Sequence, residues 1–116
     1  MKTYGLIGEN LSHSFSQKYF QQKFSKEGIK DCQYLNFELN DISTLRKLVQ
    51  KNDIKGLNIT IPYKEKVIPF LDEITRQADK IGAVNTIQIK GNKLIGHNTD
   101  ILGFEQSIFP IIDGRK

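Results

Sequence analysis

Gly56-Leu57-Asn58-Ile59-Thr60-Ile61-Pro62-Tyr63-Lys64 has the pattern of a strand that leads directly into a helix. Pro62 ends the strand, because a proline has no N–H group to give to a central ladder. Lys64 then falls in the first turn of the helix that follows. A cation is slightly unfavourable there against the helix dipole, so stability alone does not explain this lysine.

Asn58 and Thr60 bring hydrogen-bonding side chains to the carboxyl end of this predicted strand. They are two residues apart and therefore share one face, while Ile59 and Ile61 point to the other face, which we expect to be the core. An amide and a hydroxyl at such a place either bind a ligand or satisfy loop backbone groups. The residues alone leave both roles open.

Strands and helices alternate through most of the chain on either side of this stretch. Strands are expected at 3–8, 32–39, 56–61, 84–90 and 93–97, and helices at 14–27, after Asp41, at 63–71, at 72–81 and at 101–112. Gly91-Asn92 is a hairpin-type turn between the last two strands. The pattern predicts an α/β fold, with a mostly parallel sheet, one antiparallel hairpin and helices on both faces.

Length and composition limit the class of protein. The 116 residues suit one domain, and Cys32 is the only cysteine, which favours a reducing compartment. The 17 Lys and Arg are scattered among 13 Asp and Glu, as on a solvated surface, so the net charge of +4 does not indicate nucleic-acid binding. With no signal-peptide or membrane-span pattern, we predict a soluble cytoplasmic protein without a membrane partner.

Lys64 and Asp100 are the candidate proton-transfer pair. Asp100 follows the last predicted strand, where it is also suited to cap the final helix. If the two side chains meet, an ammonium donor for a carbonyl oxygen lies beside a carboxylate that orients it.

Ser14 and Ser16 lie where the first predicted helix begins. Ser14 with Gln17 matches a capping box, which is a structural role. Hydroxyls and free backbone N–H groups at a helix start also bind a carboxylate, and capping does not explain Ser16. Asn85-Thr86 repeats the pairing of an amide with a hydroxyl at a strand start. No glycine-rich nucleotide loop and no metal-binding motif occurs in the chain.

Together, four ordered blocks resemble the substrate-binding domain of the shikimate dehydrogenase family. The blocks are Gly8 through Ser16, Asn58 through Lys64, Ile81 through Thr86, and Gly96 through Asp100 followed by Gly103. The resemblance implies reduction of 3-dehydroshikimate to shikimate with NADPH, in aromatic amino acid biosynthesis. It also implies that residues 1–116 are the substrate-binding domain, and that the NADP-binding Rossmann domain is absent from this chain.

The resemblance also implies roles for individual residues. Ser14 and Ser16 are expected to hold the substrate carboxylate. Lys64 is expected to exchange the proton at the carbonyl, with Asp100 beside it. Contacts to the ring hydroxyls are expected from Thr60, Lys64, Asn85 and Asp100. Asn58 is expected to shape the turn after its strand.

The chain departs from the family pattern in two ways. Glu9-Asn10 stands where the family has Asn-Pro, and Gln17 stands where it has Pro after the paired serines, which loosens the substrate loop. The chain also ends before a cofactor domain, so we expect it to be inactive alone. The alternatives are a stand-alone module that binds a small polyhydroxy carboxylic acid and a relative that acts on quinate or uses NAD; the residues do not indicate an oligomeric state.

Overall fold

The computed structural model describes residues 2–11 and 16–99. Within them the strands are β1 (Lys2–Gly8), β2 (Cys32–Glu38), β3 (Ile54–Ile59), β4 (Glu73–Ile74), β5 (Thr86–Lys90) and β6 (Lys93–His97). The α-helices are α1 (Ser16–Lys26), α2 (Leu45–Asn52), α3 (Tyr63–Lys66) and α4 (Arg76–Ile81), with 3₁₀ turns at Ile42–Thr44 and Ile68–Phe70. The helix predicted at 101–112 lies outside the described residues.

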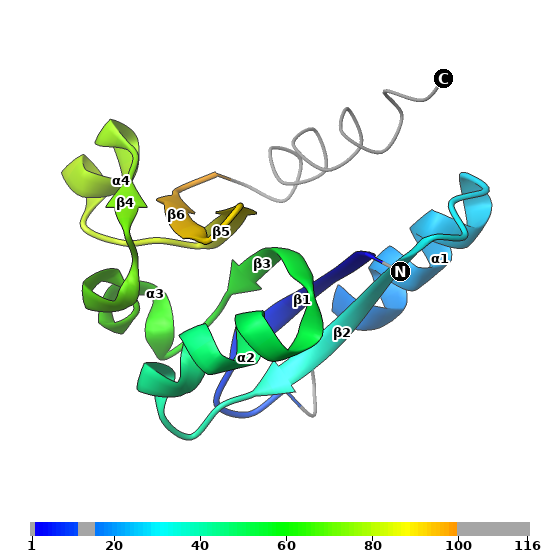
Figure 1. The fold of residues 1–116 in the computed structure, drawn as a ribbon, viewed down its shortest axis with the longest axis horizontal. Helices are drawn as coiled ribbons and strands as arrows, with labels where there is room; N and C mark the ends of the chain where they lie inside the picture. The colour runs from blue at the N-terminus through cyan, green and yellow to red at the C-terminus, as the bar shows by residue number, and fades with distance from the viewer. Residues whose placement is uncertain (1, 12–15, 100–116) are drawn as a thin grey trace.

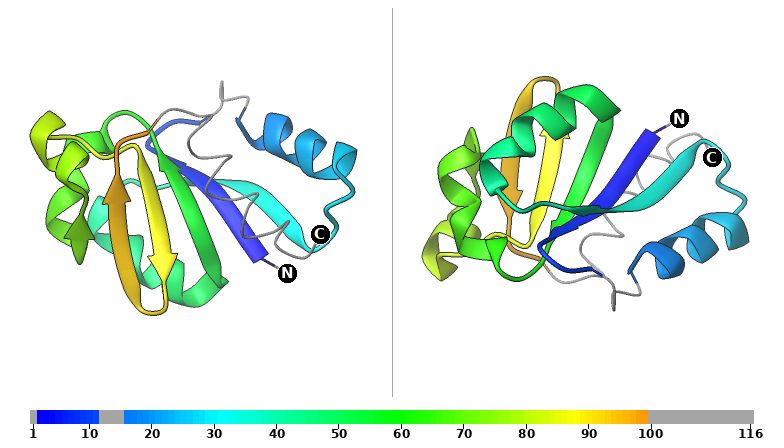
Figure 2. Two further views of the ribbon diagram at one scale, coloured as in Figure 1. Left: turned by 90° about the horizontal axis from the view of Figure 1, so that it is seen from above. Right: turned by 90° about the horizontal axis from the view of Figure 1, so that it is seen from below.

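The strands form one mixed sheet in the order β2-β1-β3-β5-β6-β4, as Figures 1 and 2 show. β1 runs parallel to β2 and β3, and β4 runs parallel to β6. β5 pairs antiparallel with β3 and β6, so β5 and β6 are the predicted hairpin. The predicted fold class is therefore confirmed.

Helices cover both faces of the sheet because β1 is apolar on both sides (Figure 2). Tyr4 and Leu6 pack with α1, where the Phe20 ring stacks on that of Tyr34 with centroids 4.5 Å apart. Ile7 faces the other way and packs with Leu45 and Val49 of α2, in a cluster that also holds residues of α3 and α4. The alternation of side chains along a central strand thus produces two cores.

Two local predictions were wrong. Asp72 to Thr75 is not helical: Asp72 N–H donates to Leu94 O and Thr75 N–H to Gly96 O, both at 2.9 Å, so pairing with β6 outweighs the local helical pattern. The hydroxyl of Thr75 then caps α4 by accepting from Ala78 N–H at 3.2 Å. Ile61 is not in the core; β3 ends at Ile59 and the turn that follows leaves Ile61 78% exposed.

Asp72 fastens β6 to α2, and its charge should matter for stability. Its Oδ2 accepts from Leu94 N–H at 2.7 Å and from Arg46 Nη2 at 3.0 Å. These bonds lower the pKa of Asp72 from its ordinary value of 3.8, so the charged form stabilises the fold above that pH and the gain is lost as pH falls through the lowered pKa.

We therefore expect Asp72→Asn to lower the melting temperature at neutral pH. The difference from wild type should shrink as the pH falls below the ordinary carboxyl value, because the wild-type side chain then also becomes neutral. Thermal unfolding followed by circular dichroism over a pH series measures this. A difference that is constant with pH would contradict the assignment.

Candidate functional site

Thr60 follows β3 at the edge of the sheet where β1 and β3 both end. Its N–H donates to the carbonyl oxygen of Ile7 at 2.9 Å. A Cβ on Gly8 would lie 2.7 Å from Cγ2 of Thr60, so a glycine is needed for this approach. Gly8 is in phase with Tyr4 and Leu6, which places Thr60 on the face that α1 covers. The Thr60 hydroxyl has no hydrogen-bond partner among the described residues and is available to a ligand.

Asn58 lies one side-chain repeat before Thr60 and serves the fold. Its Nδ2 donates to the Tyr34 hydroxyl at 2.8 Å. Because β1 separates β3 from β2, this bond reaches across the central strand. We predicted that Asn58 shapes the turn after its strand, and the structure gives it a cross-strand bond instead.

Lys64 is exposed on α3, the short helix that follows the turn at residues 61–62. The N–H of Tyr63 donates to Thr60 O at 3.0 Å, so the helix begins directly above the end of β3. The carbonyl oxygen of Lys64 accepts from Val84 N–H at 2.7 Å. These backbone bonds fix the start of the lysine side chain, and the residue is exposed.

Asn85 joins the two chain segments that meet at the start of β5. Its Oδ1 accepts from Thr99 N–H at 2.8 Å and from the Thr86 hydroxyl at 3.1 Å, and its Nδ2 donates to Thr99 O. Asn98 adds a second clamp, because its Nδ2 donates to Ala83 O at 3.0 Å. The bond to Thr99 uses one of the two Nδ2 hydrogens of Asn85.

The loop at residues 83–85 therefore gathers three of the sequence-predicted positions. Val84 holds the backbone of Lys64, and Asn85 holds Thr99, which precedes Asp100. Ile59 N–H donates to Asn85 O at 2.7 Å, which places Thr60 beside the same loop. An ammonium, a hydroxyl and an amide thus lie at one edge of the sheet.

The remaining predicted positions fall wholly or partly outside the described residues. Ser14 and Asp100 lie outside them. Ser16 is described as the first residue of α1, but its side chain is not described. α1 begins at Ser16 and covers the face on which Thr60 lies. The predicted roles of these three residues stay predictions.

Sequence reasoning missed two residues that build this edge. Asn98 lies in the sequence block Gly96 through Asp100, and its hydrogen bond to Ala83 O joins residues 15 apart in the chain. Tyr63 stands beside Lys64, and its hydroxyl donates to Leu39 O, 24 residues away in the chain. In the sequence, Asn98 is an amide at a strand end and Tyr63 is a tyrosine after a proline. Neither local pattern predicts a hydrogen-bond partner that is distant in the chain.

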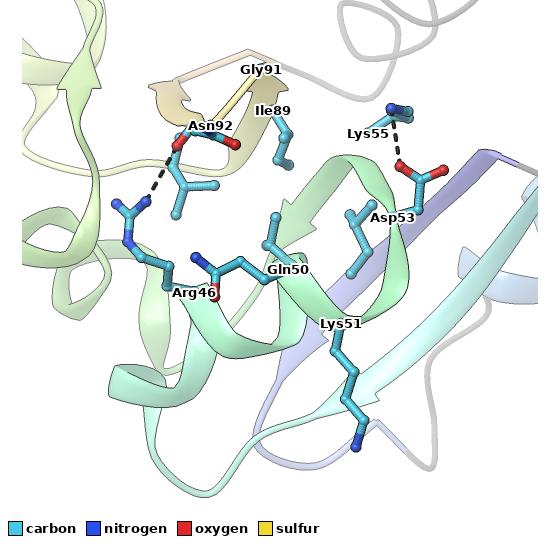
Figure 3. Close-up of a pocket in the computed structure, with 11 residues that line it drawn as sticks. Arg46, Gln50, Lys51, Asp53, Lys55, Ile89, Gly91 and Asn92 are labelled. Atoms are coloured by element: carbon cyan, nitrogen blue, oxygen red, sulfur yellow. Dashed lines mark hydrogen bonds and ion pairs between the residues drawn. The ribbon is translucent and has the colours of Figure 1, made fainter.

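A hollow of about 540 Å³ lies elsewhere, between α2, the turn before β3 and the β5–β6 hairpin (Figure 3). It opens at the amino end of β3, whereas Thr60 and Lys64 follow its carboxyl end. Arg46 on its wall pairs with Asp72 at 3.0 Å, and Lys55 pairs with Asp53 at 3.1 Å. Because the hollow lies at the opposite end of β3 from Thr60 and Lys64, we do not place the substrate in it.

Other titratable groups do not add to the site. His97 on β6 contacts Gln88 Oε1 through Nε2 at 3.1 Å, and burial lowers its pKa, which favours the neutral ring. In residues 2–11 and 16–99, no three His, Cys, Asp or Glu side chains gather as metal ligands do.

No helix in that part of the chain has the length and apolar character needed to cross a membrane.

Known proteins match the chain over most of its length. The family model for the shikimate dehydrogenase substrate binding domain matches residues 6–87. The shikimate dehydrogenase (NADP(+)) of Clostridium botulinum strain Hall is 43% identical over 109 residues, which are 93% of this chain and 42% of that protein. The chain thus spans less than half the length of this relative.

Solved structures agree with this match. Shikimate dehydrogenase 1 from Peptoclostridium difficile has a TM-score of 0.80 and 42% identity, over 96% of this chain and 41% of that one. Quinate dehydrogenase from Corynebacterium glutamicum, solved with NAD, has a TM-score of 0.75 and 33% identity, over 94% and 42%. The sequence motifs, the fold and these matches agree, and the chain belongs to the shikimate dehydrogenase substrate binding domain family.

Proposed function

We propose that the natural protein carrying this chain reduces 3-dehydroshikimate to shikimate with NADPH, and that residues 1–116 form its substrate-binding domain. The observation that carries the proposal is the loop at 83–85, which holds Lys64 through Val84 and Thr99 through Asn85. It brings the predicted proton donor and the residue before Asp100 to the edge where Thr60 lies. That is the expected place for a ligand site at strand carboxyl ends.

In the proposed reaction this chain binds the substrate and handles the proton. The Thr60 hydroxyl and the second Nδ2 hydrogen of Asn85 bond to ring hydroxyls, and Ser14 and Ser16 hold the carboxylate. The protonated amine of Lys64 donates to the carbonyl oxygen as it gains negative charge, and Asp100 orients that amine. In the reverse direction Lys64 accepts the proton from the hydroxyl.

NADPH, when bound, supplies the hydride. The chain has no glycine-rich loop for its phosphates, so its residues do not fit this cofactor, and we assign NADP binding to residues outside 1–116. We also propose the cytoplasm as the compartment, since Cys32 is buried and, as the single cysteine of the sequence, cannot form a disulfide within this chain.

Two linked measurements test the proposal. The natural protein should oxidise NADPH in the presence of 3-dehydroshikimate, and the isolated chain should show no turnover, because hydride transfer requires the nicotinamide to be positioned against the carbonyl. Turnover by the chain alone at the rate of the natural protein would contradict the proposal that NADP binds to residues outside 1–116.

The same assay separates the alternatives. Quinate with NAD is the second candidate, because a quinate dehydrogenase is among the solved structures that match. A higher kcat/KM for quinate than for shikimate in the oxidation direction would replace the proposed substrate. Calorimetric binding of shikimate without any turnover by the natural protein would instead indicate a binding module.

A further inference from the structure

The helix that carries Lys64 is too short to orient a side chain by itself. α3 has four residues, Tyr63–Lys66, and a single turn gains little from its own hydrogen bonds. The direction of the Lys64 side chain must therefore come from contacts that hold this turn against the rest of the domain. The backbone bond from Val84 is one such contact, and it acts from the side of β5.

Tyr63 supplies the contact on the opposite side. Its side chain is 3% exposed and packs in the same core as Val67, one turn further along. Its hydroxyl donates to the carbonyl oxygen of Leu39, just after β2. Leu39 N–H in turn donates to Gly8 O at 2.9 Å, so the partner of Tyr63 is itself fixed to the end of β1.

The geometry assigns Tyr63 as a positioning residue for Lys64, an inference that rests on the proposed function. The chain of bonds from Gly8 through Leu39 to Tyr63 fixes α3 from the β1–β2 side, and Val84 fixes it from the β5 side. Neighbouring residues on a helix point about 100° apart, so a buried Tyr63 holds Lys64 outward. The Lys64 side chain therefore leaves α3 on its exposed side, from a backbone that is fixed.

The Tyr63 hydroxyl is suited to a hydrogen bond to Leu39 O that persists as pH changes. Burial, together with the carboxylates of Glu9 and Asp41, raises its pKa, which keeps the hydroxyl a neutral donor. A carbonyl oxygen such as that of Leu39 can only accept a bond, so this pair has one donor and one acceptor. The contact therefore does not depend on the charge state of the site.

The test is Tyr63→Phe in the natural protein, because this change keeps the ring and removes the hydroxyl. We expect kcat to fall roughly 10- to 100-fold, since small misplacement of a reacting group is costly. KM for shikimate should change less than about 3-fold, because Lys64 acts mainly in the transition state. Tyr4→Phe removes a buried hydroxyl on the α1 side and should leave kcat unchanged, and Phe24→Leu controls for a general loss of stability.

A second readout does not need enzyme activity. Hydrogen exchange of the Val84 amide, which is bonded to Lys64 O, should speed up about 10-fold or more in Tyr63→Phe while the Leu57 amide in β3 is unaffected. Unchanged Val84 exchange, or a kcat within about 2-fold of wild type, overturns the inference. An equal loss of kcat in Phe24→Leu also overturns it. If the wild type does not reduce 3-dehydroshikimate, the proposed function fails, and Val84 exchange alone decides whether Tyr63 holds α3.

Discussion

Replacing Lys64 with alanine is expected to lower kcat for 3-dehydroshikimate reduction by roughly 10²- to 10⁴-fold, the range that a positioned general acid contributes. The backbone of Lys64 is fixed by the bond from Val84, so truncation should remove the amine and leave the turn in place. KM should change much less than kcat, because the proton is needed most as charge develops on the carbonyl oxygen. Initial rates of NADPH oxidation measure both.

Lys66→Ala is the matched control. Lys66 is exposed on the same short helix, and two residues along a helix turn a side chain by about 200°, away from the direction of Lys64. The control therefore removes the same charge from α3 without touching the proposed proton path. Equal losses in the two variants would show that the charge of α3 matters and that Lys64 has no special role.

The fold was predictable where the signals are local. The strand 93–97 was found with the predicted bounds, and Gly91 in the preceding turn has the positive φ of 62° that a hairpin glycine allows. β4 was missed because it has two residues and exists through its bonds to β6, about 22 residues away. A pairing of this kind leaves no pattern in its own segment.

The candidate site was predictable in its residue types and less so in its assembly. Thr60 was identified at a strand end, Lys64 in the helical turn that follows it and Asn85 at a strand start, and the structure brings them to one edge of the sheet. The contacts that set this arrangement, from Tyr63 to Leu39 and from Asn85 to Thr99, join segments that are 24 and 14 residues apart. Residue type and spacing predict chemistry, whereas these anchors depend on the tertiary fold.

Gly5→Ala should produce the largest loss of stability of any small change in the central strand. A Cβ at Gly5 would lie 2.5 Å from the carbonyl oxygen of Leu35 and 2.6 Å from the ring of Phe37, both on β2. A backbone oxygen in a paired strand cannot move aside alone, so β1 and β2 must shift apart. We expect a loss of about 2–3 kcal/mol in the free energy of unfolding, as for other overpacked core sites.

Gly56→Ala on the neighbouring strand β3 is the control for this prediction, because its Cβ would meet the ring of Tyr4 at 3.1 Å and the carbonyl oxygen of Ile87 only at an ordinary contact distance of 3.7 Å. The Tyr4 ring need shift by only a few tenths of an ångström, and the lower entropy of the unfolded chain offsets about 0.4–1 kcal/mol of the strain, so the loss should be smaller than for Gly5→Ala. Urea unfolding of both variants measures the difference, and equal losses would contradict the steric argument.

The shift at Gly5 should also reach the site, because Gly8 lies under Thr60 and its carbonyl oxygen holds Leu39, the partner of Tyr63. Gly5→Ala should therefore weaken shikimate binding as well as the fold, whereas Gly56→Ala should leave binding near that of the wild type.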